Sequence, residues 1–267
     1  MPGEVLLVLI GLATGFIAGL LGAGAGFGTV VLLIAAGTGP HLAIGTSPIY
    51  TTVIGSWGTI LHLRRGNANA RLALAMGLPS AVTAFFGAQL ADASSAKALV
   101  VSFGAVTLAV AGAFLVWPVR KDEPAPPPIS GAQEGMAGSR RRHAPLPLTM
   151  MVGAVVGGAF IGILQGLYGV GGGFLLMPFM VLVLKIPERV AVGSSLFALV
   201  FGSISSGVRH ALLGNVGAGM LVWLIPGGLI GSFAGAALVR RVAPSTIRRT
   251  FVAMMFVSAA YLLNKGL

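Results

Sequence analysis

The chain of 267 residues contains no cysteine. Disulfide bonds, thiolate metal sites and cysteine nucleophiles are therefore excluded. Charged residues make up only 9% of the sequence, whereas a soluble globular domain carries about 25%. Hydrophobic residues make up 56%, and the mean hydropathy is +0.95. These values indicate an all-α polytopic membrane protein, because many apolar runs approach the ~20 residues that a spanning helix needs.

Acidic residues are the rarest charged group, with 6 Asp and Glu against 17 Lys and Arg. All of them fall at expected loops or termini: Glu4, Asp92, Asp122, Glu123, Glu134 and Glu188. The absence of carboxylates from the spans argues against a carboxylate proton relay, a cation channel and a divalent-metal permease. No nucleophile–base set or G-x-G-x-x-G motif appears. We therefore expect no enzymatic activity, no cofactor and no metal.

Two glycine stretches organise the chain. Gly22-Ala-Gly-Ala-Gly-Phe-Gly28 recurs as Gly169-Val-Gly-Gly-Gly-Phe174. Each follows a long apolar segment and precedes a short one, at 27–36 and 174–184. Glycine leaves backbone N–H groups uncovered and permits unusual backbone angles. Helix packing explains many membrane glycines, but the i, i+2 spacing here favours short broken or re-entrant helices.

The remaining apolar segments divide into two similar sets. The expected long spans are 4–21, 43–63, 72–91, 96–117, 148–168, 190–212, 217–239 and 247–263. Residues 118–147 form a Pro- and Arg-rich linker that cannot bury a core. We therefore expect a first repeat at 1–117, a cytoplasmic linker at 118–147 and a second repeat at 148–267.

Matching residues indicate that the two halves are copies. The first-half residues Gly15, Gly19, Gly24, Phe27, Ser47, His62 and Asn67 correspond to Gly162, Gly166, Gly171, Phe174, Ser195, His210 and Asn215. Glycine matches are common in a chain with 41 glycines. A histidine and a Gly-Asn pair in the same register are not, so the duplication is the better explanation.

The positive residues predict how the two copies are oriented. With about five membrane segments per half, the copies are inverted. All Lys and Arg except Lys97, Arg209 and Lys265 then fall on the side of the linker. Parallel copies with four segments per half give a much weaker bias. The positive-inside rule therefore favours two inverted repeats, with the linker in the cytoplasm and both termini outside. It also explains the net charge without nucleic acid.

Inverted repeats with broken helices typically hold their substrate where the breaks converge, and helix N-termini suit an anion. Hydroxyl groups supply further donors, although back-bonding to helix carbonyls also explains serine and threonine. For Gln165 and Tyr168, interhelical bonding and substrate contact both remain open. The candidate substrate-binding residues are Gly22, Gly24, Gly26, Thr46, Ser47, Gln165, Tyr168, Gly169, Gly171, Gly172, Gly173, Ser194 and Ser195.

Two histidines occupy equivalent positions at the ends of long spans. His62 and His210 are either interface residues or proton-exchange groups, since histidine titrates near neutral pH. Arg209 beside His210 is placed to attract anions through its charge. We consider these three residues a candidate proton or anion relay.

The glycine stretches at 19–26 and 166–174, the Ala-Val-Gly-Ser-Ser segment at 191–195 and the Gly-Asn pair at 214–215 resemble the TauE/SafE sulfite-exporter family. The resemblance covers both halves and leaves out only the linker. It implies a bacterial inner-membrane transporter of sulfite, sulfonates or related sulfur oxyanions. Ala23 and Ala25 stand where the second copy has Val170 and Gly172, so the first stretch is the tighter one.

Together these observations predict a secondary transporter of a small anion that works by alternating access. A passive anion channel and a non-transporting membrane scaffold or biogenesis factor are the alternatives. The expected partners are the anion and the lipid bilayer, and a second copy of the chain is an open possibility.

Overall fold

The computed structural model describes residues 2–21, 24–64, 68–116, 147–238 and 244–266. These residues form ten α-helices and no strand. The first half contains α1 (Glu4–Leu21), α2 (Gly26–Ala35), α3 (Pro40–Arg64), α4 (Ala70–Ala93) and α5 (Ala96–Val116). The second half contains α7 (Leu148–Tyr168), α8 (Gly173–Leu182), α9 (Glu188–Leu212), α10 (Ala218–Leu238) and α11 (Pro244–Gly266). The all-helical prediction is thus confirmed for the described part of the chain.

Not every helix meets the length and hydropathy expected of a membrane span. Five of the described helices do so by length and composition: α4, α5, α7, α9 and α10. The helices α2 and α8 contain 10 residues each. At 1.5 Å per residue each is ~15 Å long, about half the ~30 Å hydrocarbon core. The two short apolar runs therefore form half-length helices, as the sequence predicts.

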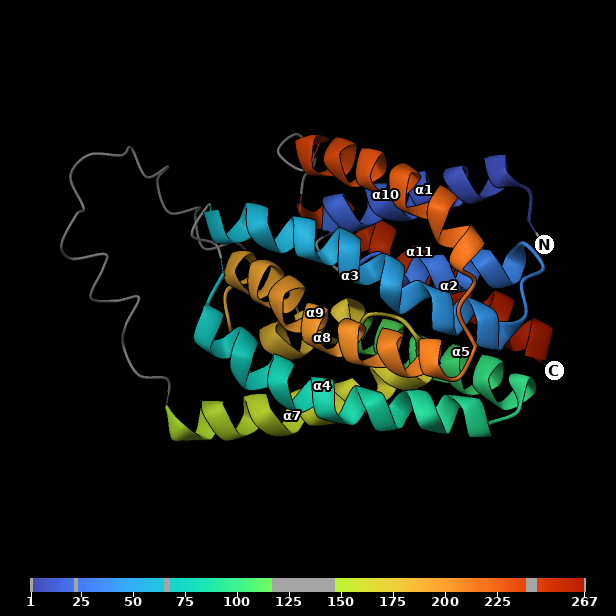
Figure 1. Ribbon diagram of the computed structural model, residues 1–267. Helices are drawn as coiled ribbons and strands as arrows, with labels where there is room; N and C mark the ends of the chain where they lie inside the picture. The colour runs from blue at the N-terminus through green and yellow to red at the C-terminus, as the bar shows by residue number, and fades with distance from the viewer. Residues whose placement is uncertain (1, 22–23, 65–67, 117–146, 239–243, 267) are drawn as a thin grey trace.

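Helices pair mainly with helices of the other half. The helix α1 packs along α10, and its counterpart α7 packs along α4. The counterparts α3 and α9 pack on each other, as do α5 and α11. In Figure 1, the N- and C-termini lie at the same end of the molecule, and α1 and α7 run in opposite directions. Each half therefore completes its packing only against the other.

Glycine stripes make the closest pairings possible. A Cβ atom at Gly15 of α1 would collide with the backbone of Gly228 in α10. The equivalent Gly162 of α7 lies against Ser80 of α4, where a Cβ would be 2.6 Å from the Ser80 Cα. Carbon atoms approach favourably only to about 3.5 Å. These glycines, spaced four residues apart with Gly19 and Gly166, are therefore helix-packing residues of the small-xxx-small kind.

Candidate functional site

The two glycine stretches meet inside the molecule. A Cβ at Gly24 would lie 3.7 Å from the Cα of Gly173. A Cβ at Gly26 would lie 2.5 Å from the carbonyl carbon of Val170, which is closer than two carbon atoms can pack. We call residues 24–26 and 169–173 the glycine crossing. The predicted site residue Gly22 lies outside the described residues.

Backbone angles at the crossing account for the glycine in both stretches. The φ angles of Gly24, Gly169, Gly171 and Gly172 are +78°, +64°, +68° and +69°. Side chains strongly disfavour this left-handed region. Gly169 ends α7, and Gly172 precedes α8. The chain thus turns between a long and a short helix within a few residues.

Both half-length helices begin at the crossing. Neither α2 nor α8 has a side-chain hydrogen bond capping its N-terminus. The first N–H groups of a helix have no partner within it, and they carry the positive end of the helix dipole. The two N-termini therefore bring positive potential from both halves to one place.

An aromatic row closes the crossing on one side. The rings of Phe27 and Phe174, each the second residue of its short helix, have centroids 5.1 Å apart. Phe103 of α5 contacts Phe27 edge-on at 5.8 Å and stacks on Tyr168 at 5.1 Å. All four side chains are buried. The predicted site residue Tyr168 thus lies beside the crossing as part of this row.

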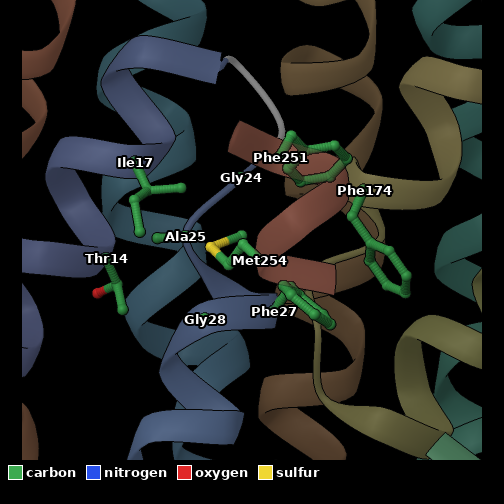
Figure 2. Close-up of a pocket in the computed structure, with 9 residues that line it drawn as sticks. All are labelled: Thr14, Ile17, Gly24, Ala25, Phe27, Gly28, Phe174, Phe251 and Met254. Carbon is green, nitrogen blue, oxygen red and sulfur yellow. The ribbon is translucent and has the colours of Figure 1, made fainter. Parts of the chain in front are cut away.

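A small apolar pocket lies next to the aromatic row (Figure 2). Its walls include Thr14 and Ile17 of α1, Gly24, and Phe251 and Met254 of α11, and its empty volume is about 230 Å³. With an almost entirely hydrocarbon lining, this pocket does not suit an anion.

Hydroxyl groups of α3 approach the crossing from a third direction. Ser47, predicted as a site residue, donates a hydrogen bond to the Gly26 carbonyl over 3.1 Å. One turn later, Thr51 is fully buried and its hydroxyl has no hydrogen-bond partner. This oxygen would lie 2.7 Å from a Cβ at Gly26 and 3.3 Å from one at Gly171. Thr51 therefore presents an unused hydroxyl to both glycine stretches.

Sequence reasoning missed Thr51. The available signal was its position four residues after Ser47, which puts both hydroxyls on one face of α3. The second half has Leu199 in its place, and Gly24 faces Leu199 as Gly171 faces Thr51. Thr51 and Leu199 occupy equivalent positions beside the glycine stretches, but because they are different residues, a search for repeated residues does not find this position.

Three other predicted hydroxyls are engaged in helix contacts. Thr46 accepts from the Gly217 N–H over 2.9 Å, just before α10. Its counterpart Ser194 accepts from the Asn69 N–H over 2.8 Å, just before α4. Ser195 donates to the Val192 carbonyl of its own helix. The hydroxyls of Thr46 and Ser194 thus form hydrogen bonds between the halves at equivalent positions. Contact of these hydroxyls with a substrate stays a prediction.

Gln165 of α7 is fully buried beside the second glycine stretch. Its amide nitrogen donates to the Leu199 carbonyl over 2.8 Å and to the Ser203 hydroxyl over 3.0 Å. Its amide oxygen has no partner, and a Cβ at Gly172 would lie 2.7 Å from it. Of the two alternatives left open for this residue, the interhelical bond is present, and an unused acceptor faces the crossing.

The three relay candidates lie in different surroundings. His62 lines a pocket with an empty volume of about 480 Å³, which extends to Gly24. His210 is buried and donates from Nε2 to the Gly166 carbonyl over 3.1 Å. The Arg209 guanidinium lies 5.0 Å from the Phe85 ring centroid and donates to Gln89. His62 therefore shares a pocket with Gly24 of the glycine crossing.

Comparison with known proteins identifies the class of this chain. A family model described as "Sulfite exporter TauE/SafE" matches residues 7–262. The probable membrane transporter protein YunE of Bacillus subtilis is 27% identical over 98% of both chains. A probable membrane transporter protein of Xylella fastidiosa strain Temecula1 is 29% identical over 98% of this chain and 97% of its own. No solved structure matches.

The matches define a multi-pass membrane transporter protein. The chain belongs to the TauE/SafE sulfite exporter family. A plant relative, the "Sulfite exporter TauE/SafE family protein 3" of Arabidopsis thaliana, is 31% identical over 41% of this chain and 24% of its own.

Proposed function

We propose that the chain is a secondary transporter that moves a small anion, a sulfur oxyanion such as sulfite or an organosulfonate, across the bacterial inner membrane. The observation that carries this proposal is the convergence of two uncapped helix N-termini at the glycine crossing. Helix N-termini bind anions through their N–H groups and dipole. The unused Thr51 hydroxyl supplies a further donor at the same place.

The site would hold the anion between backbone groups of Gly24, Gly26 and the 171–173 turn, with Thr51 as a side-chain donor. An oxyanion needs several donors and no fixed acceptor geometry. No basic side chain is among the residues placed at the crossing. Binding by N–H groups and a hydroxyl avoids burying a permanent charge in the membrane, which would be costly when the site is empty.

Inverted repeats are part of this proposal. The exchange of helix partners between the halves supports them, as do the opposite directions of α1 and α7 in Figure 1. Such repeats commonly produce alternating access by rocking about a central site. The positive residues favour a cytoplasmic linker and external termini. The pocket at His62, near the end of α3, then lies toward the cytoplasm.

Reconstitution into liposomes tests the transport proposal. A carrier gives saturable uptake of labelled sulfite that unlabelled sulfite on the opposite side accelerates. A passive anion channel gives uptake that does not saturate and shows no acceleration. Absence of uptake under any gradient would contradict both and favour a scaffold or biogenesis factor.

A further inference from the structure

The amide orientation of Gln165 is determined by its partners. The Leu199 main-chain carbonyl can only accept, so the group 2.8 Å from it must be the amide nitrogen. The Ser203 hydroxyl accepts from the same nitrogen. Flipping the amide would place two oxygens in contact. The side-chain oxygen is therefore held toward Gly172 and Gly202, neither of which has a side chain to cover it.

That oxygen is an unused acceptor in the protein interior. Gln165 has 0% exposure, and no hydrogen bond reaches its Oε1 atom. A buried polar atom without a partner is unfavourable and calls for a functional or ligand-based explanation. The equivalent residue in the first half is Ala18. The acceptor is therefore a feature of one side of the crossing alone.

The polar groups near the Gln165 oxygen are hydrogen-bond donors. The helix α8 begins at Gly173 without a side-chain cap, and the first N–H groups of a helix have no partner within it. Thr51 presents an unused hydroxyl beside Gly171. A fully deprotonated oxyanion satisfies these donors but is repelled by the Gln165 oxygen. An anion that retains a proton, or carries an N–H or O–H group, satisfies both kinds of partner.

We propose that Gln165 makes this site selective for small sulfur oxyanions that carry a hydrogen-bond donor of their own, such as hydrogensulfite. This selectivity rests on the proposed transport function. A site built to pair with a substrate donor rejects analogues that lack it, because its own polar group is then left without a partner.

Two stable monoanions of similar size separate the classes. Sulfamate carries an NH₂ donor where methanesulfonate carries a methyl group. Each would compete against labelled sulfite uptake by the full-length protein in liposomes. We expect sulfamate to inhibit at a concentration at least about tenfold lower than methanesulfonate, the scale of one lost hydrogen bond in a buried site.

Two variants assign the selectivity to the Gln165 oxygen. In Gln165→Met, which keeps the length but removes the acceptor, the sulfamate preference should fall to less than about threefold. The matched control, Ser203→Ala, removes a partner of the amide nitrogen but leaves the acceptor and the Leu199 bond. It should keep the preference of the parent protein.

The outcomes distinguish this inference from the proposed function. Sulfite uptake with no sulfamate preference, including the case in which neither anion competes, overturns the selectivity and leaves the transport function standing. A water molecule that satisfies the oxygen would give this result. A preference that survives in Gln165→Met also overturns it. Absence of sulfite uptake overturns both.

Discussion

Under the proposed transport function each half lines a route to the glycine crossing, and the side chains along the two routes differ. In the first half, Gly55, Gly58 and His62 of α3 line a pocket that reaches Gly24. Their counterparts on α9 are Ser203, Ser206 and His210. There, Gln165 bonds to Ser203, and His210 bonds to the Gly166 carbonyl.

The substitution of Ala18 by Gln165 contributes to this difference. Ala18 lines the first-half pocket, and its counterpart Gln165 fills the corresponding space beside Gly202 and Ser203. The backbones differ as well, since Ala25 before α2 has a φ angle of −80° and its counterpart Gly172 before α8 has one of +69°. Side chains at equivalent positions therefore give the two halves different surroundings, as the proposed alternating-access mechanism requires of a state that opens toward one side.

The largest expected effect comes from filling the crossing, which both routes share. In Gly26→Ala the new Cβ would lie 2.5 Å from the Val170 carbonyl carbon, so one glycine stretch must move away from the other. We expect sulfite uptake in liposomes to fall at least about 100-fold, since displacements near 1 Å have such effects on aligned sites.

The matched control is Gly39→Ala, because no atom lies within 4 Å of a Cβ there. It should transport normally. Size-exclusion profiles would verify that both variants are folded. Normal uptake by a folded Gly26→Ala protein would contradict the site assignment.

A smaller effect on uptake is expected from removing the Thr51 hydroxyl, which the second half lacks because Leu199 stands at the equivalent position. Thr51→Val keeps the side-chain shape and removes the unused hydroxyl. Uptake should fall about tenfold, as for a lost hydrogen bond to a charged group. Thermal stability should stay equal or rise, because an unpaired buried hydroxyl is itself unfavourable.

Thr59→Val is the control on the same helix, since the Thr59 hydroxyl bonds only to the Gly55 carbonyl of its own helix. Its uptake should change little. Unchanged uptake in Thr51→Val would remove Thr51 from the binding site. A fall in thermal stability large enough to explain the reduced uptake by loss of folded protein would remove it as well.

The smallest effect is expected in an experiment that compares the two routes directly. Because the chain has no cysteine, single introduced cysteines can be labelled without background. Ser232 lines the first-half pocket, and its counterpart Ala84 is fully buried. A membrane-impermeant thiol reagent should label Ser232→Cys several-fold faster than Ala84→Cys, and from the cytoplasmic side. Adding Ala18→Gln should slow the labelling of Ser232→Cys.

Equal labelling of the two cysteines would show that the routes do not differ in solution. Faster labelling of Ser232→Cys from outside would instead reverse the proposed orientation of the halves. The relative labelling rates therefore test the difference between the two routes, and the side of labelling tests the orientation of the halves in the membrane.

Much of the architecture follows from local sequence patterns. Apolar runs of different length predicted long helices and the two half-length helices, and the glycine stretches predicted the breaks before Gly26 and Gly173. These features depend on residues close together in the chain: hydropathy sets the helices, and glycine alone tolerates the left-handed backbone that interrupts them.

The candidate site was less predictable. Thr46 and Ser194 are predicted to bind the anion, and the structure adds that both accept hydrogen bonds from main-chain N–H groups that precede helices of the other half. Thr51 was not expected at all. Whether a hydroxyl is used or left unpaired depends on which distant segment approaches it, and the spacing along one helix does not contain that information.

The sequence by itself determined the class of the protein and the positions at which its helices break, because composition and backbone freedom are properties of short stretches. The duplication of the chain stays a prediction. Only the tertiary structure decided that the two breaks meet, that Thr51 and the Gln165 oxygen remain unpaired beside them, and that a pocket reaches Gly24 from His62. Those outcomes depend on side-chain fit between helices from opposite halves, where one added or missing side chain changes what can pack.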